Sequence, residues 1–360
     1  MKKFNQEFKV GNKTIGGNNP TYFIADIAAN HDGSLERAKE LIFLAKESGA
    51  DCAKFQHFSA KKIVSDYGFK DPKIGKISHQ ASWNKSVYDI YDQYHTRTEW
   101  TEELVTTCKE ADIEFMTAPY DIDAVDKLNP YLNAFKVGSG DITYKEELEH
   151  IAKTGKPIFL ATGASTIDDV ETALNFLEDN QDICLMQCNT NYTGSKDNLH
   201  FINLNVLNQY RQKFPGIILG LSDHTHGHAS VLGAIALGAK AVEKHFTDDN
   251  SRVGPDHSFA MNPVTWKNMV EASRELEQCM GDGIKKIENN EAVTVLIQRR
   301  AIRTNKKLTK GTKILQEDLD FLRPCPTGAI DPREVESIIG MTTTKDLEDG
   351  EELYWEHLKN

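Results

Sequence analysis

The stretch GLSDHTHGHASVLGAIALGAKAVEKHFT, residues 220–247, decides the fold and locates the first candidate site. An apolar segment ends just before His224, a helical pattern follows, and a second apolar segment ends in Glu243, Lys244 and His245. We interpret the apolar segments as two strands joined by a helix, which makes them parallel neighbours in one sheet. His224 and His245 then stand at equivalent strand ends, where two imidazoles can converge on a divalent metal ion. The alternative is that His224 caps a helix and His245 fills a gap in the core.

The same alternation of strand and helix patterns extends through the rest of the chain. Amphipathic stretches such as LERAKELIFLAKESG separate the apolar segments and end at Gly, as helices commonly do. Eight such units occupy about residues 20–282, close to the roughly 250 residues typical of a (β/α)8 barrel. We therefore predict an α/β TIM barrel; a doubly wound open sheet is the competing fold, although it more rarely repeats eight units in series. The predicted strands are residues 22–29, 51–57, 113–118, 134–137, 157–161, 183–187, 217–221 and 239–246.

The segments on either side of the predicted barrel have a different character. Residues 1–18 read as a hairpin turning at Gly11-Asn12, which would cap the barrel of residues 19–283. A charged linker covers residues 284–296, and residues 297–360 hold short β-like segments separated by turns. A β-rich domain of this size has a marginal core, so we expect it to dock on another surface.

One long insertion interrupts the series at residues 59–97, after the second predicted strand. It is rich in Lys, Ser, Tyr and Asp and includes ISHQASWNKSVYDIYDQY. A loop of this length after a barrel strand is typical of a lid or a substrate loop, and a solvated excursion is the alternative.

Composition narrows the class of protein. With 39% hydrophobic and 27% charged residues, the chain is typical of soluble globular proteins, and we expect a cytoplasmic protein without a membrane segment. The six cysteines form no CxxC pair, which favours reduced thiols over a disulfide framework. A net charge of −12 argues against nucleic acid as a partner but permits an anionic small substrate in a locally basic cleft.

Polar residues at the ends of the other predicted strands suggest what the metal would act on. Lys54 and Lys136 lie within apolar strands, as does Lys244, and a buried lysine requires an anion to meet. The small residues of VGSGD after Lys136 allow backbone N–H groups to approach a phosphate, with Ser139 beside it. Such a pocket suits a phosphorylated carbon nucleophile and a carbonyl polarised by a Lewis-acid metal, while a carboxylate such as Asp26 positions or deprotonates water.

These strings together resemble the sialic acid (nonulosonate) synthase family, which condenses phosphoenolpyruvate with an N-acetylated amino sugar. The resemblance covers nearly the whole chain and rests on KFQ, KVGSGD, ATG, GLSDHT, VEKHFT and GPDHSFAMNP, in that order. It implies a TIM barrel followed by a C-terminal antifreeze-like (SAF, β-clip) domain. It also implies a homodimer in which this domain is exchanged between subunits.

Carried over position by position, the resemblance makes His224 and His245 ligands of a divalent ion, with manganese expected and magnesium or cobalt as alternatives. Lys54, Lys136 and Ser139 match positions that hold phosphoenolpyruvate. Asp26, Lys54 and Lys136 are accordingly the predicted catalytic residues.

The phosphate side of the predicted site departs from the family pattern at three positions. Asp26 stands where the family usually has Glu, so the reach of its carboxylate is one methylene shorter. Ala118 and Ala161 stand where hydroxyl residues commonly hold the phosphate. We predict that the adjacent Thr117 and Thr162 substitute for them.

The sugar side carries its own expectations from the resemblance. Ser82 falls where a sugar-binding Asn is expected, with Asn84 nearby, and the strand-six string CNTNY is reordered. These differences leave the acceptor sugar open, because amino-sugar pockets discriminate through a few polar contacts. The predicted sugar contacts are Gln56, Asn84, Tyr192, Asp256 and, from the partner subunit's C-terminal domain, Arg323.

The expected activity is that of a transferase, N-acetylneuraminate synthase, using phosphoenolpyruvate and N-acetylmannosamine. A legionaminic or pseudaminic acid synthase acting on a diamino sugar, or a synthase using a sugar 6-phosphate, is the nearer alternative. A non-catalytic barrel that binds an amino sugar is the alternative from another class. A metal aldolase using free pyruvate is disfavoured because it has no need for phosphate-holding lysines.

Overall fold

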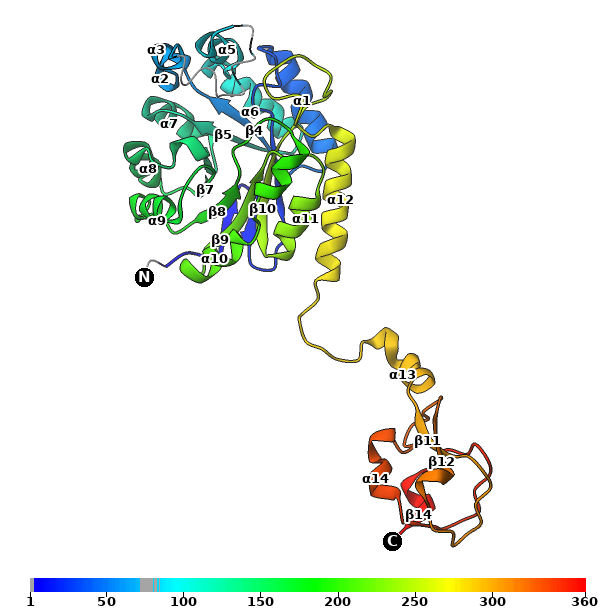
Figure 1. The fold of residues 1–360 in the computed structure, drawn as a ribbon. Helices are drawn as coiled ribbons and strands as arrows, with labels where there is room; N and C mark the ends of the chain where they lie inside the picture. Colours follow the sequence, from blue (N-terminus) through cyan, green and yellow to red (C-terminus); the bar gives the residue numbers. More distant parts are fainter. Residues whose placement is uncertain (1–2, 72–79, 81–82, 84) are drawn as a thin grey trace. The chain divides into compact units, whose positions relative to one another are not determined.

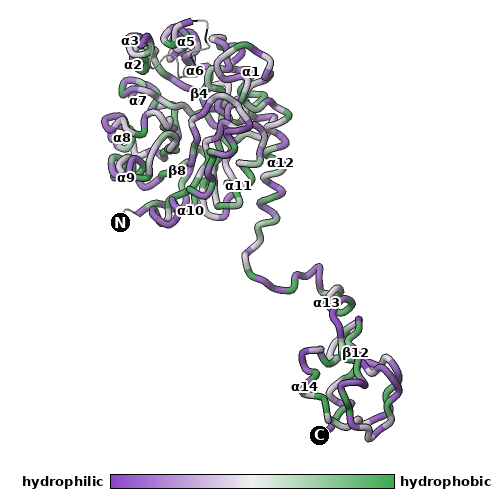
Figure 2. Tube along the Cα trace, in the orientation of Figure 1, coloured by the Kyte–Doolittle hydropathy of each residue, from purple (hydrophilic) through white to green (hydrophobic). Residues whose placement is uncertain are grey.

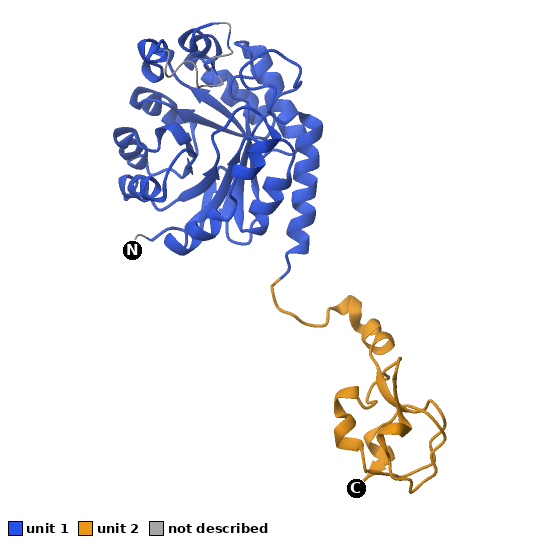
Figure 3. Ribbon diagram, in the orientation of Figure 1, with its two compact units in different colours: residues 1–281 blue, residues 282–360 orange. Residues whose placement is uncertain are grey.

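The structure is a computed structural model that describes residues 3–71, 80, 83 and 85–360. The chain divides into two compact units, Met1–Gly281 and Asp282–Asn360 (Figure 3). Each unit has its own hydrophobic core.

The first unit is a barrel of eight parallel strands, which confirms the predicted fold (Figure 1). The strand order is β5-β4-β3-β10-β9-β8-β7-β6, and the two end strands β5 and β6 also lie in contact, so the sheet closes. The strands are β3 (Tyr22–Asp26), β4 (Cys52–His57), β5 (Glu114–Pro119), β6 (Phe135–Val137), β7 (Ile158–Ala161), β8 (Ile183–Cys188), β9 (Ile218–Asp223) and β10 (Ala239–His245).

A layer of helices surrounds the strands (Figure 1). In Figure 2 the outer helices alternate between hydrophilic and hydrophobic residues, as amphipathic helices on a barrel must. None of the helices in the described part of the chain has the length and apolar character needed to span a membrane. The helices are α1 (Leu35–Glu47), α6 (Thr101–Glu110), α7 (Ile122–Leu128), α8 (Lys145–Ala152), α9 (Ile167–Phe176), α10 (Val206–Lys213), α11 (Ala229–Ala236) and α12 (Pro263–Cys279).

Side chains of each strand alternate between two cores, one inside the barrel and one between strands and helices. On β3, Ile24 packs inside the barrel, whereas Phe23 and Ala25 pack against the helices. The hairpin of β1 (Glu7–Val10) and β2 (Lys13–Gly16) contributes Phe8 and Ile15 to the inner core. The hairpin therefore closes the end of the barrel at which the strands begin.

The first barrel strand is shorter than predicted. It ends at Asp26, three residues before the predicted end at Ala29. Ala28 has a positive φ of 46°, so the backbone turns there instead of continuing as a strand. Ala29 consequently lies on the loop between β3 and α1.

The insertion after β4 forms short helices in its described part: α2 (Ala60–Ile63), α3 (Asp66–Phe69) and α5 (Val87–Tyr94). Phe58 stands just before them, and its ring packs on the ring of Tyr91 with centroids 5.2 Å apart. The role of this insertion as a lid stays a prediction.

The second unit is a small β-rich module built on a compact apolar core. The helix α13 (Ala292–Gln298) precedes two antiparallel pairs, β11 (Ala301–Thr304) with β12 (Leu319–Leu322) and β13 (Thr342–Thr343) with β14 (Leu358–Lys359); α14 (Val335–Ile338) lies between them in sequence. The core contains Ile302, Leu308, Ile314, Leu319, Ile330, Ile338, Leu347, Leu353 and Leu358.

Glu147 of α8 is a buried carboxyl whose two oxygens have no hydrogen-bond partner among the described residues. Burial, and then the charges of Asp141 and Asp121, raise its pKa from 4.5 to about 8. The native state therefore holds this proton more tightly than the unfolded chain does, and stability falls as pH rises between those two values. We expect Glu147→Leu to remove that fall, which is on the order of 1.4 kcal/mol per pH unit at most. Urea titrations from about pH 5 to about pH 9 measure it as the free energy of unfolding.

Glu146→Leu is the matched control, because Glu146 is the exposed neighbour of Glu147 on the same helix. It should keep the wild-type pH dependence. An unchanged pH profile in Glu147→Leu would contradict the expectation.

Candidate active site

A cavity of about 410 Å³ opens among the loops that follow the barrel strands. This is the end of the barrel at which (β/α)8 enzymes place their active sites. Its described lining comprises Ala29, Gln56, Phe58, Ile63, Gln80, Trp83, Ile90, Tyr91, Tyr94, Tyr120, Gly138, Ser139, Gly140, Asp141, Tyr192, His245, Pro255 and Asp256.

Two lysines and two carboxylates form a buried ionic cluster inside the barrel. Lys54 Nζ lies 2.7 Å from Asp26 Oδ2 and 3.7 Å from Glu243 Oε1, and Lys136 Nζ lies 3.4 Å from the same Glu243 oxygen. All four side chains are at most 6% exposed. Lys54 precedes Gln56 by two residues on β4, so the cluster forms the layer below the one that lines the cavity.

Neighbouring charges shift the pKa values of Lys54 and Glu243 toward the ionised form in spite of burial, whereas burial shifts that of Asp26 toward the neutral form. Burial alone lowers the pKa of Lys54, but the charges of Asp26 and Glu243 outweigh it and raise that pKa. Burial likewise opposes ionisation of Glu243, yet Lys136 and Lys54 lower its pKa. For Asp26, burial dominates and raises the pKa in spite of Lys54. A polyanionic substrate would therefore find two cations whose present partners it can replace or share.

His224 and His245 converge as predicted from their equivalent strand ends. Their ring centroids are 5.3 Å apart, and the ring of Tyr192 packs against both. Burial lowers the pKa of His224 to about 4 and that of His245 to about 3, so both rings are neutral near pH 7. His224 Nδ1 lies 3.0 Å from the Asn189 carbonyl oxygen and can donate a hydrogen bond to it. In that tautomer Nε2 carries the lone pair that could bind a metal.

This pair fits a metal ion that keeps open coordination positions. His245 Nδ1 is buried without a hydrogen-bond partner in the described structure, 3.7 Å from Asp256 Oδ2. A neutral imidazole nitrogen left unpaired in a buried site is a donor that a divalent cation can use. No group of three or more His, Cys, Asp or Glu side chains among the described residues is placed to hold an ion. The remaining ligands would come from water or substrate.

The predicted sugar contacts that the structure describes in the barrel gather around the cavity. Gln56 donates from Nε2 to Asp26 Oδ2 at 3.0 Å, so it links the cavity lining to the ionic cluster. Burial raises the pKa of Asp256 to about 7, and the Ala29 amide donates to its Oδ2 at 3.3 Å. Tyr192 also lines the cavity, and so does Ser139, whose Oγ accepts from the Gly163 amide at 2.9 Å.

Two predicted phosphate contacts point away from the cavity. Thr117 lies on the helix-facing side of β5, where its hydroxyl donates to the Phe55 carbonyl and lies 2.8 Å from His57 Nδ1. Thr162 donates to the Met186 carbonyl and accepts from the Tyr210 hydroxyl. Neither hydroxyl is therefore placed to substitute for those missing at Ala118 and Ala161, because adjacent strand residues face opposite sides.

Lys244 meets the anion that its buried position requires, and that anion is Asp223. Counting from His245, alternation turns Lys244 toward the helices, and its ammonium donates to Asp223 Oδ2 at 2.5 Å and to the Thr225 carbonyl at 2.6 Å. It is part of the outer packing and not of the barrel mouth.

Three residues considered for the sugar side cannot be placed at the cavity. Asn84 and Ser82 lie outside the described residues. Arg323 is exposed on the second unit.

The cavity also contains residues that strand-end reasoning missed. Asp141 lines it directly after the GSG turn, and burial raises the pKa of its carboxyl to about 6. Tyr91 and Tyr94, from α5 in the insertion, also line it. The repeated tyrosines of YDIYDQY were the available signal, since a three-residue spacing places Tyr91 and Tyr94 on the same face of a helix.

Two family models and several characterised enzymes match this chain. The sequence model of the NeuB family matches residues 41–285, and that of the SAF domain matches residues 299–359. The N,N'-diacetyllegionaminic acid synthase of Campylobacter jejuni is 34% identical over 336 residues, 92% of this chain and 98% of the relative. The human N-acetylneuraminate-9-phosphate synthase is 30% identical over 353 residues, 96% of this chain and 95% of the relative.

A solved structure shares the fold. The N-acetylneuraminic acid (sialic acid) synthetase of Leptospira borgpetersenii superposes with a TM-score of 0.70 at 24% identity, covering 81% of this chain and 96% of that one.

Proposed function

Because this chain belongs to the NeuB family, we propose that it condenses phosphoenolpyruvate with an N-acetylated amino sugar. The products would be a nine-carbon 2-keto-3-deoxy sugar acid and inorganic phosphate. The observation that carries the proposal is the position of the Lys54–Asp26–Glu243–Lys136 cluster, which lies one layer below a cavity bordered by His245.

The barrel residues divide the chemistry between them. Lys54 and Lys136 bind the carboxylate and phosphate of phosphoenolpyruvate, and Ser139 at the cavity wall contacts the same anion. Carbon 3 then attacks the aldehyde carbon of the open-chain sugar, and the aldehyde oxygen takes up a proton to become a hydroxyl. Water adds to carbon 2, and the bond from carbon 2 to the phosphate oxygen breaks, which leaves the keto group and inorganic phosphate. Asp26 orients that water and accepts its proton, consistent with a carboxyl whose pKa burial has raised. When bound by His224 and His245, a divalent ion, manganese in the first place, supplies Lewis-acid polarisation of the aldehyde oxygen.

The proposed acceptor is a hexosamine. The lining of the cavity favours a hexosamine with two N-acetyl groups as the acceptor, in preference to N-acetylmannosamine. Phe58, Ile63, Trp83 and Ile90 give the cavity an apolar wall that can receive a second acetamido methyl. The described lining contains Asp141 and Asp256 but neither Lys nor Arg, which disfavours a 6-phosphorylated acceptor. We further propose a homodimer in which Arg323 reaches the partner's barrel.

Phosphate release from phosphoenolpyruvate tests this proposal directly. With manganese present, we expect release to require an acceptor, with kcat/KM highest for a 2,4-diacetamido sugar, lower for N-acetylmannosamine and lowest for its 6-phosphate. Mass spectrometry should show the acceptor mass increased by a three-carbon pyruvate unit. Release with none of these sugars, combined with measurable sugar binding, would instead establish a non-catalytic binding protein.

A further inference from the structure

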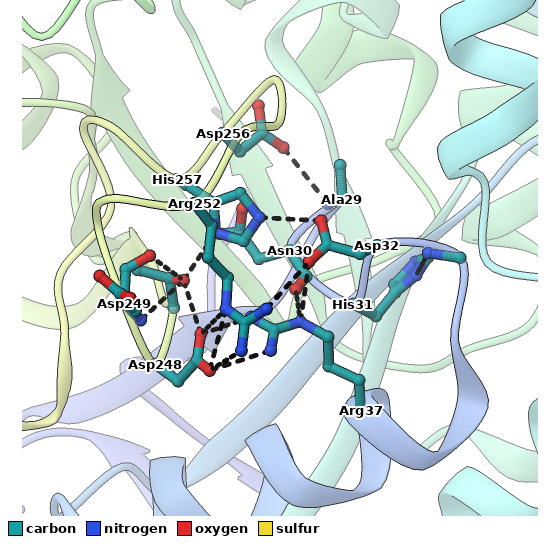
Figure 4. A network of polar contacts seen from close by, with 12 residues as sticks. Ala29, Asn30, His31, Asp32, Arg37, Asp248, Asp249, Arg252, Asp256 and His257 are labelled. Atoms are coloured by element: carbon teal, nitrogen blue, oxygen red, sulfur yellow. Dashed lines mark hydrogen bonds and ion pairs between the residues drawn. The ribbon is translucent and has the colours of Figure 1, made fainter.

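Two loops at the cavity mouth, far apart in sequence, are joined by a network of ion pairs (Figure 4). One is the loop between β3 and α1, which carries Ala29 and Asp32. The other is the long loop between β10 and α12, which carries Asp248, Asp256 and His257. Ala29 and Asp256 both line the cavity, so the fit between these loops shapes its edge.

Arg37, in the first turns of α1, is the centre of this network. Its Nη1 donates to Asp248 Oδ2 at 2.9 Å and its Nη2 pairs with Asp248 Oδ1, so the carboxylate is held by both ends of the guanidinium fork. Its Nε donates to the Asn30 carbonyl at 2.8 Å and lies 3.0 Å from Asp32 Oδ2. The side chain is only 10% exposed, so these contacts are shielded from competing water.

Arg252 makes a second, more exposed contact to the same carboxylate. Its Nη2 lies 2.9 Å from Asp248 Oδ2, but its side chain is 43% exposed. Burial alone would raise the pKa of Asp248, yet the hydrogen bonds from Arg37 and Arg252 lower it well below its usual range. Asp248 is therefore ionised throughout the neutral range. Of its two arginine partners, Arg37 is the buried one and Arg252 the exposed one.

His257 ties the second loop to the first by another route. Its Nε2 lies 2.9 Å from Asp32 Oδ1 and its Nδ1 lies 2.7 Å from Thr247 Oγ1, while the ring is fully buried. Asp32 therefore contacts both Arg37 and His257. His257 directly follows the cavity-lining Asp256 in the chain. Because His257 is fixed between Asp32 and Thr247, the backbone at Asp256 has little freedom to move outward.

The position of Asp256 depends on this junction. Its carboxylate accepts from the Ala29 amide on the first loop at 3.3 Å and lies 3.7 Å from the ring of His245. If the loops separated, Asp256 would lose its contact with Ala29 and the cavity would open at that edge.

We propose that Arg37 is a positioning residue that joins the two loops and so holds Asp256 at the acceptor end of the cavity. The meaning of that position for catalysis rests on the proposed function. Arg37 is not among the described residues that line the cavity, so its effect must pass through its partners Asn30, Asp32 and Asp248.

The test compares Arg37→Met, Arg37→Lys and Arg252→Met in the full-length protein. For Arg37→Met we expect kcat/KM for the acceptor to fall by roughly 10- to 100-fold, as for other losses of supporting contacts, with KM for phosphoenolpyruvate changed by no more than about threefold. Arg37→Lys should recover part of that loss, since it keeps the charge but not the fork. Arg252→Met, which removes the exposed contact to the same carboxylate, should stay within about twofold of wild type.

Hydrogen exchange of residues 247–260 gives a second readout that needs no turnover. We expect faster exchange there in Arg37→Met and wild-type exchange in Arg252→Met. If Arg37→Met does not fold, Asp248→Asn weakens the same junction and should show both effects. Wild-type acceptor kinetics with wild-type loop exchange would overturn the proposal, as would an equal loss for both substrates. Absence of turnover in the wild-type protein would refute the proposed function alone, because the exchange comparison would still decide the role of Arg37.

Discussion

Lys54→Met is expected to reduce kcat/KM for phosphoenolpyruvate by roughly 100- to 1,000-fold, the usual cost of losing one preorganised group that stabilises developing charge. Lys54 is the ammonium shared by Asp26 and Glu243, and it lies on the cavity-facing side of β4. Its loss removes a cation for the substrate and leaves two carboxylates with less compensation. Steady-state kinetics with varied phosphoenolpyruvate measure the effect.

Lys244→Met provides a matched control within the same barrel. Both lysines are buried in strands and both pair with a buried aspartate, Asp26 or Asp223. Either substitution leaves that aspartate short of its cation, which costs about 3–5 kcal/mol of stability. Only Lys54 faces the cavity side, so only Lys54→Met should change kcat/KM after correction for the folded fraction. Equal kinetic losses in both variants would show that the effect comes from stability and not from substrate binding.

His245→Ala is the second substitution with a large expected effect. We expect phosphate release to fall by roughly 1,000-fold or more, since Lewis-acid polarisation contributes several kcal/mol to the barrier. Removing the metal with a chelator should have the same effect on the wild-type protein, and added manganese should restore its activity but not that of the variant. Metal content after gel filtration, measured by mass spectrometry, checks binding separately from turnover.

His57→Gln is the control for burial alone. His57 is also a buried histidine near a strand end, but it faces the helices between Thr117 and Thr101. It should lose stability while retaining metal and turnover. Full turnover of His245→Ala in metal-stripped buffer would show that the paired imidazoles do not serve the reaction.

The order of strands and helices could be read from the sequence because each element carries its own local pattern. Parallel barrel strands are nevertheless buried on both faces, so hydropathy does not reveal which face is inside. Thr117 and Thr162 were therefore given to the barrel interior, although each stands one position from Ala118 or Ala161, so alternation along the strand would have warned against both assignments. The inward positions of Lys54 and Lys136 were predicted correctly because a buried charge demanded a partner.

By itself, the sequence determined the barrel, the hairpin at its closed end, and the convergence of His224 with His245 at neighbouring strand ends. Those features depend on periodicity and on the geometry of parallel connections, which are local rules. Only the tertiary structure decided that α5 would supply tyrosines to the cavity and that Arg37 would meet Asp248, 211 residues away. Contacts of that kind arise when barrel closure brings separate loops to one rim, and no spacing within either loop encodes the partner.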